Sequence, residues 1–255
     1  FIHLMSAEPQ LIPVGLEQNF QPDLQQLNRH KRSNTKGLWL ASPSNPTGTI
    51  IERERLEQAC DWARRERLHV LVDEIYQGLH YVDDMPSVLE IDQSCCVVNS
   101  FSKYFGMTGW RLGWIVVPEA FAEKANILAQ NLYISAPSIA QYAALAAFTD
   151  DAREIFEQRR VAFLERRDYM AVALKELGFR LSDNIQGAFY IYANISRFSQ
   201  DSEQFCADLL ENYGVAITPG SDFGDYQSNL FVRIAFTTSM ENLHLGIERL
   251  RTALA

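Results

Sequence analysis

The sequence contains few cysteines and histidines, and their spacing matches no metal-binding or disulfide pattern. Among 255 residues there are four cysteines and five histidines. No two cysteines form a CxxC pair, no HExxH string occurs, and Cys95–Cys96 lies in an apolar run that indicates a buried strand. Disulfide scaffolds are shorter and denser in cysteine. We therefore expect reduced thiols, no metal site and a cytoplasmic location.

Basic residues are also in deficit, and long apolar runs are missing. Lys and Arg number 23 against 32 Asp and Glu, so the net charge is -9, whereas nucleic-acid-binding proteins carry a basic surface. The basic pairs Arg64–Arg65 and Arg166–Arg167 stand among acids in helical patterns, which predicts solvated helix faces. No stretch approaches the roughly 18 consecutive apolar residues of a membrane helix. We expect neither nucleic acid nor membrane as a partner.

Three short apolar runs each end in polar, turn-forming residues. They cover residues 38–41, 69–72 and 95–98, and they precede Ser-Pro-Ser-Asn-Pro-Thr-Gly, Asp-Glu and Asn-Ser-Phe-Ser-Lys. A helical stretch over 53–67 separates the first two. Buried strands that alternate with helices indicate a parallel sheet covered by helices. Ligands of such sheets bind beyond the carboxyl ends of the strands, which is where these polar clusters stand.

A long helix is predicted over residues 151–177. Phe156, Phe163, Met170 and Leu177 recur on one face, with Ile155, Ala162 and Tyr169 beside them. Asp151 with Glu154 matches a capping box, and Gly178 matches a C-terminal stop. A helix of this length commonly bridges two domains.

The elements around this helix predict two domains. Before it we expect a strand over 112–117 and helices over 119–129 and 138–148. After it, strands over 188–193, 215–217 and 231–235 alternate with helices over 202–213 and 240–253. We place the boundary within the long helix, so that residues 1–155 form a large domain and residues 156–255 a smaller α+β domain.

Taken one at a time, the polar clusters have ordinary interpretations. Asn45-Pro46-Thr47-Gly48 is a turn sequence. Asp73–Glu74 also fits a metal-binding carboxylate pair, although no GxxxxGK[ST] motif precedes it. Lys103 fits a surface lysine, and Arg233, between two apolar residues, fits a strand residue that points to solvent. Only their order and spacing favour a shared site.

In that order, the strings resemble the signature of the class I/II pyridoxal-phosphate-dependent aminotransferases of fold type I. They are SNPTG at 44–48, VDEIY at 72–76, SFSKYFGMTGWRLGW at 100–114, GAFY at 187–190, TPGSDFG at 218–224 and FVRIAF at 231–236. The resemblance covers essentially the whole chain. It implies a three-layer α/β/α large domain with a mostly parallel sheet, a smaller α+β C-terminal domain, and a homodimer.

The resemblance assigns four residues to the reacting part of pyridoxal 5'-phosphate. Lys103 matches the lysine whose amine forms the Schiff base and then carries the substrate proton. Asp73 matches the acid that keeps the pyridine nitrogen protonated, so that the ring accepts electrons. Tyr76 and the amide of Asn45 match the groups that hold the phenolic oxygen of the ring as an anion.

Four further matches concern the phosphate and the substrate. Ser100, Ser102 and the guanidinium of Arg111 match the phosphate-binding groups of the family. Arg233 matches the arginine that holds the α-carboxylate of the substrate in a two-point fork, with Asn45 beside it.

The activity implied is transfer of an amino group from an L-α-amino acid to a 2-oxo acid, with 2-oxoglutarate as the default acceptor, by a ping-pong Schiff-base mechanism. Carbon–sulfur lyases of the same fold, which usually carry His at the position of Tyr76, and aminocyclopropane-carboxylate synthases are the enzymatic alternatives. Transcriptional regulators that join a winged-helix module to an aminotransferase-like domain are an alternative of another class.

The chain departs from the family pattern at its N-terminal side. Family members normally carry a hundred or more residues before the position that matches Phe1. That stretch supplies a glycine-containing phosphate loop, an aromatic residue that stacks on the pyridine ring, and a tyrosine that reaches across the dimer. We therefore treat the chain as N-terminally truncated. We expect it to bind the cofactor poorly by itself and to expose apolar surface.

Overall fold

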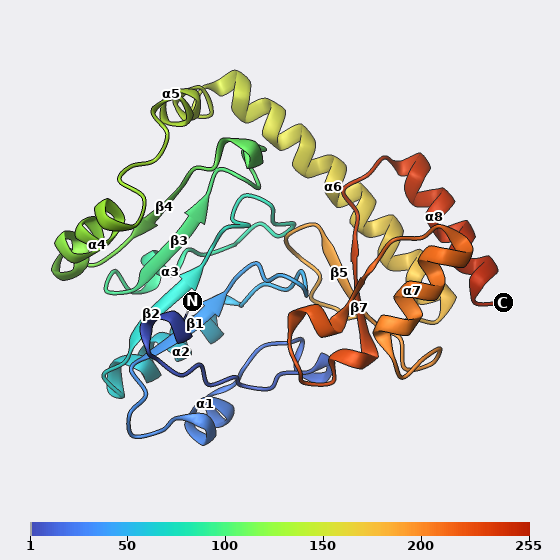
Figure 1. The fold of residues 1–255 in the computed structure, drawn as a ribbon, viewed down its shortest axis with the longest axis horizontal. Coiled ribbons are helices and arrows are strands. Elements are labelled where there is room, and N and C mark those ends of the chain that lie inside the picture. The colour runs from blue at the N-terminus through green and yellow to red at the C-terminus, as the bar shows by residue number, and fades with distance from the viewer. Residues whose placement is uncertain (1) are drawn as a thin grey trace.

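The computed structural model describes residues 2–255, which form two β-sheets joined by a long helix (Figure 1). The first sheet has the order β1-β2-β3-β4 and comprises β1 Gly37–Ala41, β2 His69–Asp73, β3 Cys96–Ser100 and β4 Gly113–Val116. The first three strands run parallel, and β4 pairs antiparallel with β3. The predicted α/β class with a mostly parallel sheet is confirmed, and the strand ends differ from the predicted ones by one or two residues.

Helix α2, Arg53–Arg65, packs an apolar face against this sheet. Leu56, Cys60 and Ala63 recur at helical spacing and are almost fully buried. They share a core cluster with alternate residues of the strands, among them Leu38, Leu40, Val70, Val72 and Val97. The short helices are α1 Leu24–His30 and α3 Val88–Ile91. The four cysteines, Cys60, Cys95, Cys96 and Cys206, are unpaired thiols.

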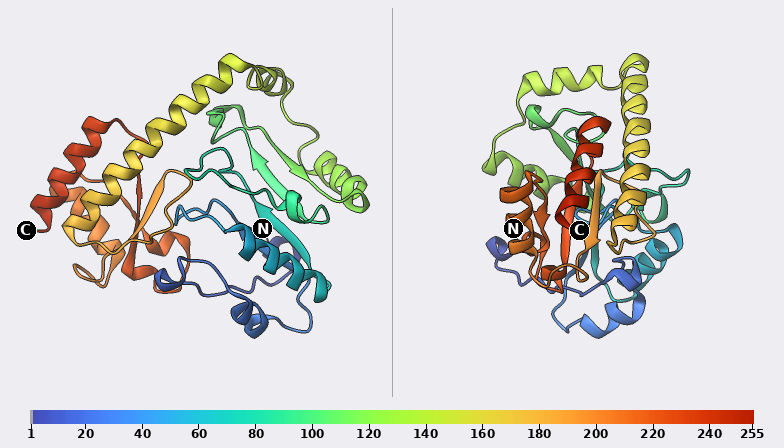
Figure 2. Two further views of the ribbon diagram at one scale, coloured as in Figure 1. Left: turned by 180° about the vertical axis from the view of Figure 1, so that it is seen from behind. Right: turned by 90° about the vertical axis from the view of Figure 1, so that its right-hand side faces the viewer.

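Helix α6, Asp150–Leu177, runs past both sheets, as Figures 1 and 2 show from three sides. Its N-cap is Thr149, whose hydroxyl accepts a hydrogen bond from the Ala152 amide. The predicted cap at Asp151 is therefore wrong, because the threonine stands two residues earlier with the extended backbone of an N-cap. Gly178 ends the helix as predicted, with φ of +102°.

The buried face of α6 meets two different clusters. Phe156 packs with Phe101 and the residues around it, whereas Phe163 and Met170 belong to the core of the second sheet. Leu174 is fully buried there. Ile155, which we expected beside the buried face, is 55% exposed. The helix thus changes partners between Phe156 and Phe163.

The second sheet is antiparallel, with the order β5-β7-β6. Its strands are β5 Tyr190–Asn194, β6 Thr218–Pro219 and β7 Phe231–Ala235, and its helices are α7 Ser202–Tyr213 and α8 Met240–Ala253. The predicted strand over 215–217 is wrong, because pairing with β7 begins only at Thr218. Strand β5 begins two residues later than predicted, since Ala188 has a left-handed φ of 56°.

Two helices and β4 expose many apolar side chains. Helices α4 Glu119–Leu132 and α5 Ser138–Ala146 follow β4, whose four residues are all exposed. The exposed apolar residues of this region, called here the β4 face, are Trp114, Ile115, Val116, Ile127, Leu128, Leu132, Tyr133, Ile134, Ile139, Tyr142 and Leu145. Among residues 2–255, no helix combines the length and apolar character needed to cross a membrane. Short 3-10 helices cover His3–Met5, Leu16–Gln18, Thr108–Trp110, Gly220–Phe223 and Ser228–Leu230.

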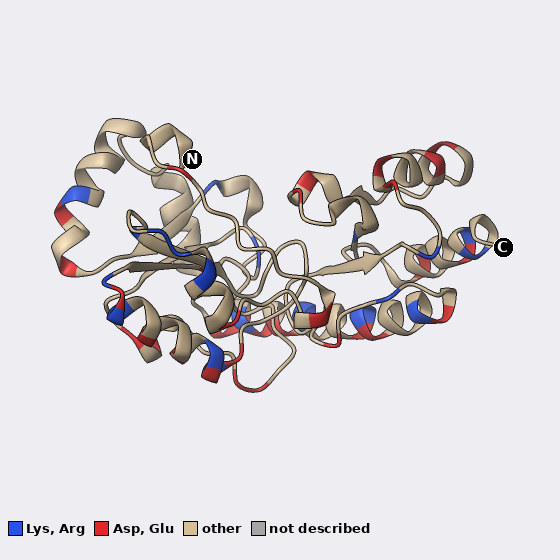
Figure 3. Ribbon diagram, turned by 90° about the horizontal axis from the view of Figure 1, so that it is seen from below, with Lys and Arg blue, Asp and Glu red and all other residues tan. Residues whose placement is uncertain are grey.

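Acidic and basic residues stand side by side along the helices (Figure 3). Arg64 pairs with Asp61 and with Asp92 at 2.7 Å each, and its side chain is 58% exposed, as predicted for a solvated face. Arg167 differs, because only 17% of its side chain is exposed and its guanidinium lies over the Tyr81 ring. The solvated-face prediction is therefore wrong for Arg167.

Candidate active site

Three strand ends bring the predicted polar residues to one edge of the first sheet. β2 ends at Asp73 and β3 at Ser100, and the loop that carries Asn45 follows β1. The register pairs Ala41 with Asp73, and Asp73 with Val98. Because parallel strands present their carboxyl ends on the same side, residues far apart in the sequence meet here.

Lys103 stands in a tight turn just beyond β3. The Gly106 amide donates to the Lys103 carbonyl at 3.0 Å, and Gly106 has a left-handed φ of +68°. Buried Phe101 anchors the start of the turn in a core cluster. The Lys103 amine Nζ lies 5.3 Å from the ring centroid of Tyr76 and 5.8 Å from that of Phe189. The turn therefore directs the amine over two aromatic rings.

The charges around Lys103 favour its neutral amine. Burial lowers the pKa of the Lys103 amine, and the positive charges of Arg233 and Arg111 lower it further, while Asp73 opposes them. Burial also raises the pKa of the Asp73 carboxyl, partly offset by a hydrogen bond from the Ile75 amide and by the Lys103 charge. The site thus combines an amine with weakened proton affinity and a half-buried carboxylate.

Tyr76 is buried beside this pair. Its hydroxyl donates to the Tyr190 hydroxyl at 3.3 Å, and the rings of Tyr76, Phe189 and Tyr190 contact each other edge to face. Burial and the Tyr190 contact hold the pKa of the Tyr76 hydroxyl well above its usual range. Tyr76 is therefore a protonated hydrogen-bond donor at neutral pH.

Arg233 extends from β7 and contacts two aromatic rings. Its guanidinium carbon lies 4.3 Å from the ring centroid of Tyr190 and 4.5 Å from that of Phe223. Nη1 donates to Asn45 Oδ1 at 2.8 Å and Nη2 to Thr218 Oγ1 at 3.5 Å. Its Nε is buried without a partner in the part of the chain described. Arg233 is therefore not a strand residue that points freely to solvent.

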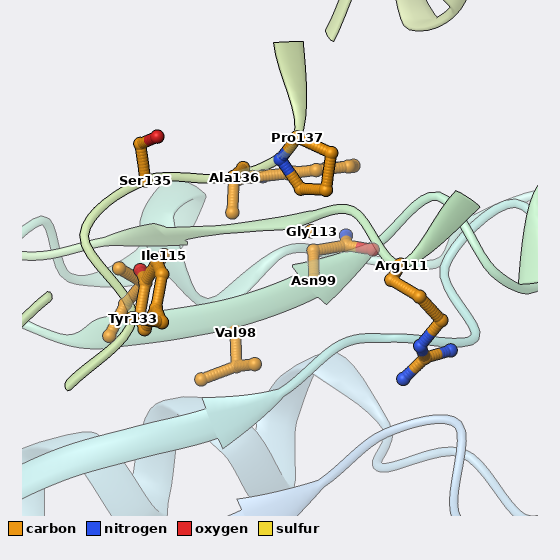
Figure 4. A pocket seen from close by; sticks show the side chains of 10 residues that line it. Val98, Asn99, Arg111, Gly113, Ile115, Tyr133, Ser135, Ala136 and Pro137 are labelled. Atoms are coloured by element: carbon orange, nitrogen blue, oxygen red, sulfur yellow. The ribbon is translucent and has the colours of Figure 1, made fainter. Parts of the chain in front are cut away.

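Ser100, Ser102 and Arg111 share one loop beyond β3. The Ser102 amide donates to Ser100 Oγ at 3.0 Å. Arg111 is exposed, has a left-handed φ of 53°, and donates to the Thr108 carbonyl at 2.9 Å. It lines a hollow of about 520 Å³ against β3 and β4, at the end opposite Ile115 (Figure 4). Two hydroxyls and a guanidinium thus lie close to Lys103 along the chain.

The Asn45 turn docks onto the loop before β5. The amides of Gln186 and Gly187 both donate to the Gly48 carbonyl, at 3.0 and 2.9 Å. Gly48 has φ of +68°, and a Cβ there would lie 2.5 Å from the Tyr190 carbonyl oxygen. Glycine is therefore required at position 48, and the docking fixes Asn45 beside Arg233.

All eight sequence-predicted residues lie on these adjoining loops and strands. The sequence interpretation gave no role to Phe189, Tyr190 and Phe223, although the strings GAFY and TPGSDFG contain them. Phe189 contacts Lys103 and Tyr190 contacts Tyr76 where the second sheet meets the first, and no pattern in the sequence encodes that meeting. The contacts of Tyr190 and Phe223 with Arg233 lie within the part of the chain that forms the second sheet.

Comparison with known proteins identifies the family. The family model for aminotransferase class I and II matches residues 1–250. The chain is 36% identical over 241 residues to a valine–pyruvate aminotransferase of Mycobacterium tuberculosis, covering 94% of this chain and 62% of the relative. It is 32% identical over 262 residues to an aspartate aminotransferase of Thermotoga maritima, covering 98% and 67%.

Comparison with solved structures leads to the same family. A Mycobacterium tuberculosis aminotransferase superposes with a TM-score of 0.91 at 36% identity, over 95% of this chain and 63% of that one. The Thermotoga maritima aspartate aminotransferase superposes with a TM-score of 0.91 at 31% identity, over 99% and 65%. The chain thus spans about two thirds of the length of its relatives, and it has their type I fold. By sequence and by structure, the chain belongs to the class I and II aminotransferases.

Proposed function

We propose that this protein transfers the amino group of an L-α-amino acid to a 2-oxo acid with pyridoxal 5'-phosphate, the cofactor of its family. The observation that carries the proposal is the Lys103 amine, whose pKa is lowered by burial and by Arg233 and Arg111, at a strand edge that also presents Asp73. Perturbed groups that converge in this way are typical of catalytic sites.

The residues present fit the cofactor and its substrate. Arg233 has a buried Nε without a partner among residues 2–255, so it retains a donor for a carboxylate. Ser100, Ser102 and Arg111 supply the hydroxyls and the cation that a phosphate requires. When bound, the cofactor supplies an aldehyde and a protonated ring that accepts electrons.

The protein residues then have separate tasks. Asp73 would hold the proton on the ring nitrogen, and Tyr76 and Asn45 would donate to the phenolic oxygen. Arg233 would hold the α-carboxylate of the substrate. The lowered pKa of Lys103 increases the share of neutral amine, which is the form that acts as a nucleophile and removes the Cα proton.

The experiment is an activity screen with the cofactor-loaded full-length protein. Aspartate, alanine, valine, aromatic amino acids and methionine serve as donors, with 2-oxoglutarate and pyruvate as acceptors, because the relatives act on different pairs. We expect a new 2-oxo acid and parallel lines in double-reciprocal plots, as ping-pong kinetics require. Sulfide release from cysteine without amino transfer would favour a carbon–sulfur lyase, and DNA retention a regulator.

We also propose a homodimer, a cytoplasmic location and a domain boundary within α6. The change of packing partners between Phe156 and Phe163 supports the boundary near residue 155. The apolar β4 face supports association, because exposed apolar patches of this kind mark interaction sites.

A further inference from the structure

Tyr190 lies between two residues on which the proposed reaction depends. Its ring lies under the Arg233 guanidinium, 4.3 Å from the ring centroid to Cζ, and its hydroxyl lies 3.3 Å from the Tyr76 hydroxyl. We infer, on the basis of the proposed function, that Tyr190 is a positioning residue that holds the carboxylate-binding Arg233 and the ring-binding Tyr76 in a fixed relation. It touches neither the substrate nor the reacting atoms in this role.

The ring contact determines the plane of the guanidinium. Phe223 is a second ring in contact with Arg233, with 4.5 Å between its ring centroid and Cζ, and contact with two rings restricts rotation of the planar group. Within that plane, Nη1 donates to Asn45 while Nε remains unpartnered among the residues described. A carboxylate needs two coplanar N–H donors, and the stack presents them in one orientation.

The contact between the Tyr190 and Tyr76 hydroxyls affects the strength of Tyr76 as a hydrogen-bond donor. Each tyrosine hydroxyl has one proton and two lone pairs, so Tyr190 can donate to Tyr76 whenever Tyr76 donates to another group. Hydrogen bonds in such a chain strengthen one another. The other charged groups that face Tyr76 are Lys103, Asp73 and Arg233. When Tyr190 donates to Tyr76, the reverse of the bond in which Tyr76 donates to Tyr190, it makes Tyr76 a stronger donor to the phenolic oxygen of the cofactor.

Two substitutions test the ring and the hydroxyl of Tyr190 separately. Tyr190→Leu removes the stack, and we expect the dissociation constant for propionate, a plain carboxylate, to rise about tenfold. Tyr190→Phe keeps the stack, so propionate affinity stays within about twofold. In the loaded protein, Tyr190→Phe should raise the pH midpoint of the cofactor absorbance by about half a unit, because the phenolic oxygen is held less strongly as an anion.

Propionate binding is measured by calorimetry with and without cofactor, beside the absorbance titration and the thermal midpoint. Tyr192→Phe is the matched control. Tyr192 lies two residues further on the same strand and stacks on Phe231 instead, so neither readout should change. If Tyr190 had only a structural role, both variants would lower the thermal midpoint, and propionate affinity and the pH midpoint would not respond differently to the Phe and Leu substitutions. That result would overturn the inference.

The inference and the proposed function fail in different ways. A wild-type protein that forms no 2-oxo acid from any donor contradicts the proposed function. In that case, the propionate arm without cofactor still tests the Arg233 stack. A wild-type protein that is active, with propionate affinity and pH midpoint unchanged in both Tyr190 variants, contradicts this inference alone.

Discussion

At the scale of single residues, Lys103 is the amine on which the proposed reaction depends. Lys103→Ala should abolish transamination and the absorbance band of the protein-linked cofactor, because no other side chain in the turn at 101–106 carries an amine. The band is measured by absorbance spectroscopy of the cofactor-loaded full-length protein, and transamination by the amount of 2-oxo acid formed. Lys175→Ala, on the exposed side of α6, is the control and should leave both unchanged. Undiminished activity without Lys103 would refute the assignment.

Asp73 should affect turnover more than cofactor retention. Asp73→Asn keeps the shape but no longer holds the ring proton, so we expect kcat to fall by at least about a hundredfold while the cofactor stays bound. A cofactor analogue with a permanent positive charge at the ring nitrogen should restore part of the rate. Absence of any rescue would mean that Asp73 acts elsewhere.

Substitutions of Arg233 and of Arg111 should impair different steps, substrate binding and cofactor binding. Arg233→Ala should raise KM for every α-amino acid and lower kcat/KM at least about tenfold, since a buried charge-assisted pair is worth roughly 2–5 kcal/mol. Arg111→Ala should instead weaken retention of the cofactor, as equilibrium dialysis measures. An exchange of the two phenotypes would show that both roles are misassigned.

The lowered pKa of Lys103 also predicts a pH-dependent stability of the cofactor-free protein. Between the folded pKa and the ordinary value of 10.5, the unfolded chain binds more protons than the native one. The contribution of Lys103 to the free energy of unfolding therefore rises with pH over that interval. Lys103→Met should stabilise the protein at neutral pH, and the gain should vanish above about pH 10.5 in urea titrations. A gain independent of pH would contradict this account.

At the scale of elements, the docking of the Asn45 turn depends on Gly48. Gly48→Ala should destabilise the protein by at least about 1–2 kcal/mol, because the position needs a left-handed φ and leaves no room for Cβ. It should also raise KM by displacing Asn45 from Arg233. Gly246→Ala in α8 is the matched control. Apart from the backbone of the helix itself and the two neighbouring residues, no atom of residues 2–255 lies within 4 Å of a Cβ added at Gly246, and alanine in a helix should stabilise by about 0.5–1 kcal/mol.

At the scale of the whole molecule, the β4 face predicts association. Leu132 and Ile139 are 78% and 71% exposed, so burying them in an interface removes apolar surface from water. We expect sedimentation of the 255-residue chain to show concentration-dependent association, which the double variant Leu132→Glu/Ile139→Glu should reduce. Leu245→Glu, at an exposed position of α8, should leave the association unchanged. A chain that stays monomeric at all concentrations would contradict the prediction.

The spacing of apolar residues and the turn-forming residues between them predicted most helices and strands. α7, α8 and β7 have their predicted bounds, since their apolar spacing and flanking residues agree with their final environment. The strand at 215–217 and the cap at Asp151 failed for the opposite reason. Strand pairing and the choice among neighbouring cap residues depend on partners outside the local window.

The sequence by itself determined the chemistry of the candidate site. The turn-forming ends of β1, β2 and β3 place Asn45, Asp73 and Lys103 at one edge, because parallel strands share a direction. Only the tertiary structure decided how the second sheet closes on that edge. It placed Tyr190 and Phe223 against Arg233 and left Nε without a partner among residues 2–255. The contacts that join the two sheets, Tyr76 with Tyr190 and Asn45 with Arg233, link residues more than a hundred positions apart. Their geometry follows from packing between two cores, which no local pattern records.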